Sequence, residues 1–226
     1  MHVHVAFTPA GAAPAPVGIV VDVLRATSTI AQALASGFRR VLCCAEIEEA
    51  RALRAEIRDS LVGGERKAVR IEGFDVGASP REFLEPRAET LILSTTNGTR
   101  AILETAERCE RVFLGSLLNL AAVARTSRAQ DVVVVCAGFQ GAFALDDAYC
   151  AGRIVQLLDG ERSDAAIAAE LVADAFPTPL EALNARTYGP PGLEEDIVFC
   201  ARESVLDVVP QLVGSIGPAA EIALGP

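Results

Sequence analysis

Apolar and polar positions along the chain define two kinds of segment that follow one another in turn. Short apolar runs, typical of buried strands, lie at 3–7, 17–24, 39–45, 90–94, 111–116 and 131–138. Between them come longer segments with helical spacing, at 25–37, 46–60, 97–108, 117–129 and 146–160. This alternation predicts an α/β fold of the three-layer α/β/α class, with a mostly parallel or mixed sheet and helices on both faces.

Two parts of the chain depart from this alternation. Residues 63–80, GGERKAVRIEGFDVGASP, are rich in glycine and polar residues and carry few helix signals. After about residue 160 the pattern is mainly helical, through PTPLEALNA, PPGLEEDIVFCARES and a final apolar VLDVVPQLV. We expect a single domain over 1–226 because no linker or repeat is visible. The alternative is that the helical part after 160 forms a separate lobe.

Composition restricts the function further. A hydrophobic content of 51% supplies a core, and the net charge of −10 argues against general nucleic-acid binding. No apolar stretch reaches the ~20 residues of a membrane span, and the N-terminus does not read as a signal peptide, so we expect a cytoplasmic protein. Six scattered cysteines without a C-x-x-C pair predict reduced, buried thiols. Helices rich in Ala, Leu and Val make a homo-oligomer plausible.

Polar turns follow four of the predicted strands. In open α/β sheets, ligands bind at the carboxyl ends of the strands, so these turns are expected to form one site. They are Asp22–Thr29, Ser94–Arg100, the Gly115-Ser116 turn with Asn119, and Ala137–Gly141 leading to Asp146 and Asp147.

The turn STTNGTRA, at 94–101, carries the clearest signal for an anion. Backbone N–H groups and the dipole at a helix N-terminus bind anions, small hydroxyls add donors, and Gly98 permits close approach. The structural alternative is helix capping, for which Ser, Thr and Asn are preferred. Arg25 and Arg100 follow two of the turns and carry guanidinium groups suited to phosphate or carboxylate, although arginines in a first helical turn are commonly solvated.

Four carboxylates provide oxygen ligands for a cation. Asp22 ends an apolar strand, where an unpaired charge is costly, and Glu65, Asp146 and Asp147 lie in or after other turns. Together they predict a Mg²⁺ site, although Asp146 and Asp147 also suit a helix N-terminus. The chain has no P-loop, no G-x-S-x-G elbow and no second Asp two places after Asp22. Of the phosphate chemistries considered, the one that remains is metal-assisted attack on phosphorus, in which arginine and hydroxyl groups stabilise the charge on the phosphoryl group.

The order of these motifs resembles a known family. VDVLRATSTIAQAL, GGER, GFDVGASP, STTNGTRA and CAGFQGAFALDDAYCAG look like the 2-phosphosulfolactate phosphatases, Mg²⁺-dependent enzymes of the coenzyme M biosynthetic route. The resemblance is strong over about 15–160. It implies a layered α/β fold and hydrolysis of the phosphate ester of a short 2-hydroxy acid with a second anionic group. The chain departs at Ala78, where the family has Asn, and at Asp146, where we expect Glu.

We therefore expect a phosphatase of small anionic phosphoesters that uses Mg²⁺. A non-catalytic anion-binding or sensor domain is the main alternative, and phosphoryl transfer to an acceptor other than water ranks lower. The predicted catalytic residues are Asp22, Arg25 and Asp147, and the predicted metal ligands are Asp22, Glu65, Asp146 and Asp147. The predicted substrate-binding residues are Thr27, Thr95, Thr96, Asn97, Gly98, Thr99, Arg100, Asn119 and Ser79.

Overall fold

The six predicted strands and the five helices between them are all present in the computed structural model, which describes residues 1–189 and 191–225. The strands are β1 (His2–Ala6), β2 (Ala15–Val21), β3 (Arg40–Cys44), β6 (Thr90–Ser94), β7 (Cys109–Gly115) and β8 (Val132–Cys136). The helices are α1 (Ala26–Ser36), α2 (Ile47–Glu56), α3 (Gly98–Ala106), α4 (Leu120–Ser127) and α5 (Leu145–Leu157).

Further elements lie in the two parts that departed from the pattern. The glycine-rich stretch forms a hairpin of β4 (Ser60–Arg66) and β5 (Val69–Arg70). After residue 160 come β9 (Glu161–Arg162), α6 (Asp164–Asp174), α7 (Pro179–Asn184), α8 (Glu194–Cys200), β10 (Pro210–Ile216) and β11 (Ala219–Leu224). Three short 3₁₀ turns complete the fold: η1 (Pro9–Gly11), η2 (Pro80–Phe83) and η3 (Leu117–Asn119).

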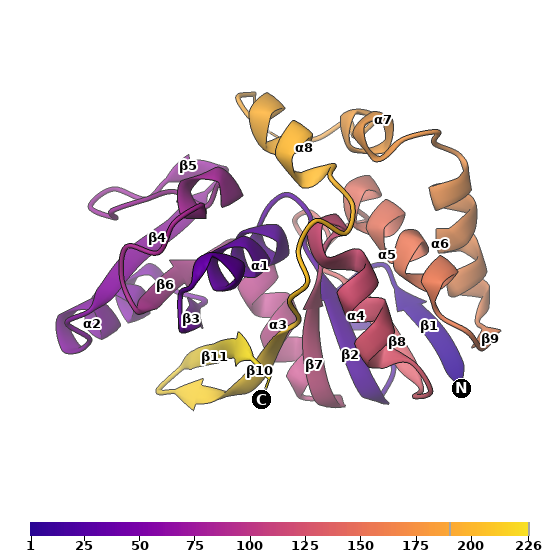
Figure 1. Cartoon of the computed structure of the whole chain (residues 1–226), viewed down its shortest axis with the longest axis horizontal. Coiled ribbons are helices and arrows are strands. Elements are labelled where there is room, and N and C mark those ends of the chain that lie inside the picture. The colour runs from indigo at the N-terminus through magenta and orange to yellow at the C-terminus, as the bar shows by residue number, and fades with distance from the viewer. Residues whose placement is uncertain (190, 226) are drawn as a thin grey trace.

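All strands join one mixed sheet in the order β5-β4-β6-β3-β11-β10-β7-β2-β8-β1-β9. Two groups of parallel strands, β4-β6-β3 and β7-β2-β8-β1-β9, are linked by the antiparallel hairpin β10–β11, which lies between them at the bottom of Figure 1. Pairing reverses three times between β3 and β7, so the two groups run in opposite senses along the sheet. The sheet must curve at the hairpin, because the turn after β6 contacts the end of β2.

Helices cover both faces of the sheet, which confirms the predicted α/β/α class. Alternate residues of β2 face opposite sides: Ile19 and Val21 pack with α4, α5 and α6, whereas Val20 packs with α1 and α3. The second core also includes Val41 and Leu93, so α1 and α3 contact both groups of strands. Helix α2 packs on the outer face of the β4-β6-β3 group.

The C-terminal hairpin corrects the expectation of a mainly helical end. Helices α6, α7 and α8 are present, but the apolar segment VLDVVPQLV leads into β10 instead of forming a helix. Its partner β11 places Ala220 and Ile222 in the core shared by the two groups of strands. The last residues therefore complete the sheet, and Figure 1 shows this yellow hairpin far from α7 and α8 at the top.

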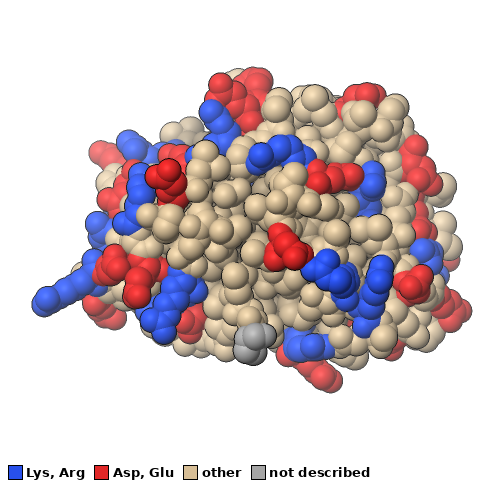
Figure 2. Space-filling model, in the orientation of Figure 1, with Lys and Arg blue, Asp and Glu red and all other residues tan. Residues whose placement is uncertain are grey.

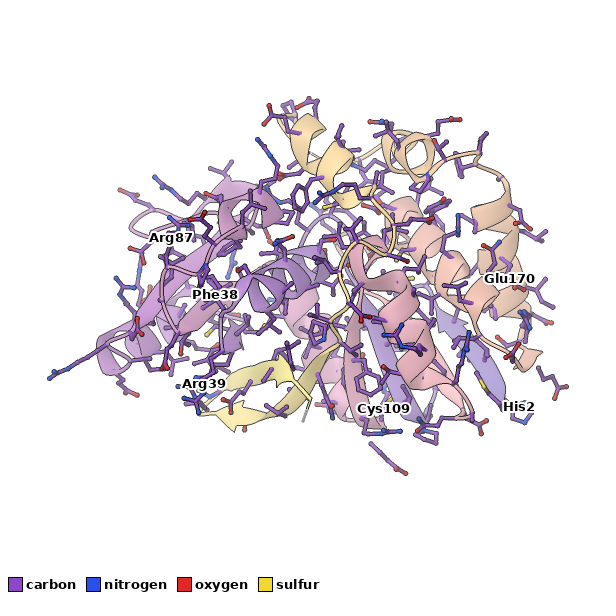
Figure 3. All side chains as sticks on the ribbon, in the orientation of Figure 1. His2, Phe38, Arg39, Arg87, Cys109 and Glu170 are labelled. Atoms are coloured by element: carbon purple, nitrogen blue, oxygen red, sulfur yellow. The ribbon has the colours of Figure 1, made fainter. Side chains whose placement is uncertain are left out.

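The cysteines, the character of the helices and the surface charges can be compared with the sequence. The six cysteines are all buried and unpaired, as predicted. Among the described residues, no helix combines the length and apolar character that a bilayer crossing requires. On the face shown in Figure 2, acidic and basic side chains are interspersed rather than separated by sign. In Figure 3, His2 at the start of β1 and Glu170 on α6 both lie toward the same outer edge of the molecule.

Candidate active site

The carboxyl ends of β2, β4, β6 and β8 meet around one cavity of about 370 Å³. The sequence predicted a site at the ends of the strands, but because the two groups of strands run in opposite senses, it is the curvature of the sheet that brings these ends together. Eighteen residues line the cavity: Asp22, Leu24, Arg25, Ala26, Glu65, Lys67, Ala68, Ala78, Thr95, Thr96, Asn97, Phe139, Gln140, Asp146, Arg186, Tyr188, Gly189 and Leu193.

Asp22 lies at the floor of the cavity, immediately after β2, and is only 8% exposed. Its Oδ1 accepts a hydrogen bond from the Ala26 amide at 3.1 Å. Burial is the main reason that the pKa of Asp22 rises to about 7, and the negative charges of Asp146 and Glu65 add to the effect. The predicted substrate ligand Thr27 instead fixes the Asp22 backbone, since its hydroxyl donates to the Asp22 carbonyl at 2.8 Å.

Gly98 lets the turn after β6 approach Asp22. A Cβ at this position would lie 2.8 Å from Asp22 Oδ2 and 2.4 Å from the Cβ of Ala26. These distances are below van der Waals contact, so any larger residue would push the two turns apart. Gly98 therefore acts by being small, and it sets the distance between the β2 and β6 turns.

The neighbouring carboxylates at the start of α5 have different tasks. Asp147 accepts hydrogen bonds from the amides of Val23 at 2.9 Å and Gly138 at 3.0 Å, and so joins the turns after β2 and β8. It is not among the residues that line the cavity, and both of its oxygens accept hydrogen bonds from backbone amides. Asp146 does line the cavity, and its Oδ1 accepts from the hydroxyl of Tyr188. Burial raises the pKa of both carboxyl groups, most strongly that of Asp147.

Glu65 connects two further turns. Its Oε1 accepts from the amide and hydroxyl of Thr96, at 3.0 and 2.9 Å, and its Oε2 accepts from the amide of Ala68 at 2.6 Å. Both carboxylate oxygens are thus engaged by the protein. Glu65 therefore links the β4–β5 hairpin to the β6 turn while it also lines the cavity.

Arg25 is buried beside the cavity and forms an ion pair with Asp196 of α8 at 2.7 Å. Its Nη2 also donates to the carbonyl of Ala68 at 3.3 Å. The hydroxyl of Ser79 donates to the other oxygen of Asp196. Ser79 therefore supports the Arg25–Asp196 pair instead of lining the cavity as a substrate ligand. Asp196 was missed because nothing in the helical pattern of 190–204 distinguishes it from a surface acid.

The STTNGTRA turn precedes α3, and part of it lines the cavity. Thr95 Oγ1 accepts a hydrogen bond from the Thr99 amide at 3.3 Å, which is a capping interaction at the start of α3. Thr95, Thr96 and Asn97 also line the cavity, whereas Thr99 is buried behind them. Capping and a cavity-facing set of hydroxyls are therefore combined in one turn.

Two predicted substrate ligands lie elsewhere. Arg100 is 67% exposed on the outside of α3, with its nearest acid, Glu46, at 3.8 Å. Asn119 is fully buried, and its side-chain amide donates to the carbonyls of Leu114 and Val208 at 3.1 Å each. Asn119 thereby fastens the segment before β10 to the end of β7. Neither residue is among those that line the cavity.

One wall of the cavity was not predicted at all. The α7–α8 loop contributes Arg186 and Tyr188, and the Tyr188 ring stacks on Phe139 with centroids 4.7 Å apart. Lys67, at the tip of the β4–β5 hairpin, adds a cation at the rim. Phe139 follows β8, so the rule that ligands bind at strand ends predicts that its turn contributes to the site. No local pattern predicts that residues 186–189 line the same cavity.

The donor set fits Mg²⁺ with fewer carboxylates than expected. No group of three or more His, Cys, Asp or Glu side chains arranged to hold a metal occurs within 1–189 and 191–225, so the predicted four-carboxylate set is not assembled. Asp22 and Asp146 both line the cavity, and each leaves its Oδ2 without a protein donor among the described residues. Two carboxylates suffice for Mg²⁺, which completes its coordination with water and substrate phosphate.

Comparison with known proteins agrees with this geometry. The family described as 2-phosphosulpholactate phosphatase matches residues 4–215 of the chain. A "Probable 2-phosphosulfolactate phosphatase" from Pseudothermotoga lettingae is 38% identical over 218 residues, covering 93% of this chain and 96% of the relative. Proteins with the same name from Caldanaerobacter subterraneus subsp. tengcongensis and Thermus thermophilus are 39% and 38% identical, covering 88% and 89% of this chain and 88% and 90% of the relatives.

The fold, the cavity and these matches together define the chain as a phosphatase, an enzyme of the class that acts on phosphate monoesters. More narrowly, the chain belongs to the 2-phosphosulfolactate phosphatase family, which confirms the resemblance of its sequence motifs.

Proposed function

We propose that this protein hydrolyses the phosphate ester of a small acidic 2-hydroxy acid in a Mg²⁺-dependent reaction, with 2-phosphosulfolactate as the substrate and 3-sulfolactate and phosphate as the products. One observation carries the proposal. Two buried carboxylates, Asp22 and Asp146, line a cavity that is also lined by Thr95, Thr96 and Asn97 of the turn before α3. Two adjacent buried acids are costly without a cation, and the donors suit phosphate oxygens.

In this proposal Asp22 and Asp146 hold the ion through their Oδ2 atoms. Bound Mg²⁺ would supply a Lewis acid for a phosphoryl oxygen and orient the attacking water. The hydroxyl of Tyr188 donates to Asp146 Oδ1, and the Ala26 amide donates to Asp22 Oδ1, so both carboxylates are held in fixed orientations. Fixed orientation of the ligands removes reorganisation from the reaction itself.

The phosphate group binds in this proposal between Arg25 and the β6 turn. Arg25 is pre-positioned by Asp196 and by the Ala68 carbonyl, and its remaining N–H groups are available for the charge that develops on phosphoryl oxygens. The stacked rings of Phe139 and Tyr188 close another wall. They limit the access of water to the site, which strengthens the electrostatic interactions inside.

The test is phosphate release from 2-phosphosulfolactate, 2-phospholactate and 2-phosphoglycolate, measured with Mg²⁺ and with EDTA. We expect release only with Mg²⁺, and the fastest rate with 2-phosphosulfolactate. Arg25→Ala is expected to abolish the rate, and Arg100→Ala is its matched control because Arg100 lies outside the cavity. Equal rates in EDTA, or equal rates in the two variants, would overturn the proposal.

A non-catalytic anion-binding domain would give a different result. Such a protein gains thermal stability from these compounds without releasing phosphate. No specific observation favours this reading, since the buried carboxylates and the phosphatase family both point to catalysis.

A further inference from the structure

Lys67 is the single lysine of a chain that has 20 lysine and arginine residues in total. The other 19 basic positions are arginine, so arginine is this sequence's usual cation. The exception lies at the tip of the β4–β5 hairpin and lines the cavity. An ammonium is a compact, mobile point charge, whereas a guanidinium is a planar fork. The use of lysine at this position alone indicates a requirement for an ammonium group.

The backbone at the tip supports a special role for its side chains. Arg66 pairs with Val69, which leaves a two-residue turn in which Lys67 has φ 54° and Ala68 has φ 60°. Turns with two left-handed residues strongly favour Asn-Gly or similar pairs, because a Cβ is unfavourable there. Lys and Ala occupy these positions against local preference. Such choices are found where a side chain has a task.

The turn is also held in place from two sides. Glu65 accepts from the Ala68 amide at 2.6 Å and from Thr96, which ties the tip to the phosphate-binding turn. Arg25 donates to the Ala68 carbonyl at 3.3 Å. The main chain beside Lys67 is therefore fixed relative to the proposed catalytic groups, while its side chain is exposed at the rim.

Hydrogen bonding to the protein distinguishes Lys67 from the other two cations of the cavity. Arg25 is paired with Asp196, and Arg186 donates to the carbonyls of Leu183 and Tyr188. Within the described parts of the chain, the Lys67 ammonium makes no hydrogen bond and no ion pair with the protein. Its charge is thus available to a ligand.

The position of Lys67 in the cavity indicates which part of a ligand its ammonium would contact. Asp22 and Asp146 are buried at the floor, where the phosphorus would react, and Lys67 stands at the rim. We propose that Lys67 is a specificity-determining residue, whose ammonium binds the carboxylate or sulfonate that the substrate carries in addition to its phosphate. This inference rests on the proposed function, because it takes the phosphate to lie at the floor.

Two substrates that differ only in the second acid group test the proposal. 2-Phospholactate and isopropyl phosphate have the same branched ester, with a carboxylate in one replaced by a methyl group in the other. Loss of one charge-assisted contact predicts that Lys67→Met lowers kcat/KM for 2-phospholactate by about 10- to 100-fold, mainly through KM. The rate with isopropyl phosphate should not change, and Lys67→Arg should retain part of the preference.

Lys67→Asn guards against an effect on folding. Asparagine tolerates the left-handed turn better than lysine, so this variant should be at least as stable as the wild type and should show the same selective loss. Equal losses with both substrates would overturn the proposal, since Lys67 would then act on the phosphate or on the fold. Unchanged rates with both substrates would overturn it as well.

A second measurement does not depend on turnover. Reductive methylation modifies amines, and the chain offers Lys67 and the N-terminal amine of Met1, which lies 3.8 Å from Asp131 and serves as an internal control. Excess 2-phospholactate should slow methylation of Lys67, read by peptide mass spectrometry, more than isopropyl phosphate does. Absence of selective protection contradicts the proposal. Protection without any hydrolysis would reject the phosphatase activity and keep the role of Lys67.

Discussion

Replacement of Asp22 by asparagine should make the metal-free protein more stable while it removes activity. Asp22 is buried, and its pKa rises from the ordinary 3.8 to about 7 because burial and the nearby acids Asp146 and Glu65 disfavour its charge. An acid with a raised pKa in the folded state binds its proton more tightly there than in the unfolded chain. The contribution of Asp22 to stability is therefore most favourable below pH 3.8 and becomes less favourable as the pH rises to about 7.

The magnitude follows from the same two values. At about 1.36 kcal/mol for each pKa unit, the cost of ionising Asp22 in the folded protein reaches about 4 kcal/mol above pH 7 and about 2 kcal/mol at pH 5. Asparagine keeps an oxygen for the Ala26 amide but carries no charge. Because water entering the cavity reduces the cost, we expect a net gain of about 1–4 kcal/mol at pH 7.5 and a smaller gain at pH 5.

Urea denaturation of both proteins in EDTA, followed by circular dichroism at several pH values from 5 to 8, measures this difference. Arg100→Ala is a suitable control because its side chain is exposed. An Asp22→Asn protein that is less stable than the wild type at pH 7.5 would refute the reasoning. A gain that does not shrink toward pH 5 would refute it equally, because the effect would then not come from the ionisation of Asp22.

Three other predictions concern the framework of the site. Gly98→Ala places a methyl group 2.8 Å from Asp22 Oδ2, so overpacking should lower the free energy of unfolding by about 1–3 kcal/mol and remove most of the phosphatase rate. A variant with wild-type stability in urea and a wild-type rate would be inconsistent with this close approach. Asp196→Ala leaves Arg25 buried without its partner and should cost about 3–5 kcal/mol, whereas Arg100→Ala should stay within about 0.5 kcal/mol. Deletion of 210–226 removes the hairpin that links the two groups of strands, so we expect loss of the cooperative thermal transition in circular dichroism; a cooperative transition near that of the full chain would show that the hairpin is dispensable.

Secondary structure could be predicted from the sequence where the local pattern of residues itself determines the element. A run such as VVVVC favours a buried strand because valine is β-branched, and β8 is present at Val132–Cys136. Strand β4 was missed because its centre is Gly63-Gly64, and glycine is a poor strand former. The structure supplies the reason for these glycines. A Cβ on Gly63 would lie 2.9 Å from the carbonyl oxygen of Gly77, and a Cβ on Gly64 would lie 2.4 Å from the carbonyl oxygen of Ser94.

The C-terminal hairpin shows another limit. The segment VLDVVPQLV is apolar without a clear period of two, so its pattern does not separate strand from helix. The turn between the strands was a usable signal, since Gly217 has φ 57° and is followed by Pro218. That Ala220 and Ile222 complete the core between distant strands depends on long-range pairing, which no local window contains.

The same division holds for the site. The position of Asp22, Thr95 and Asp146 after strands follows from the pattern of an α/β sheet, whereas their meeting at one cavity depends on the curvature between two groups of strands that run in opposite senses. Their separate tasks do not follow from it: Asp147 beside Asp146 binds backbone amides instead of lining the cavity. Tyr188 reaches the site from a loop between two C-terminal helices, and only the packing of those helices puts it there.

The central claim is that the cavity around Asp22 is a phosphatase active site. Its most direct test is phosphate release from 2-phosphosulfolactate in Mg²⁺ by the wild type, Asp22→Asn and Arg100→Ala, with folding of each verified in the same preparation. We predict comparable rates for the wild type and Arg100→Ala, and a rate at least ~100-fold lower for Asp22→Asn, since one of the two proposed carboxylate ligands of Mg²⁺ is removed. Undiminished release by a folded Asp22→Asn protein would contradict the account.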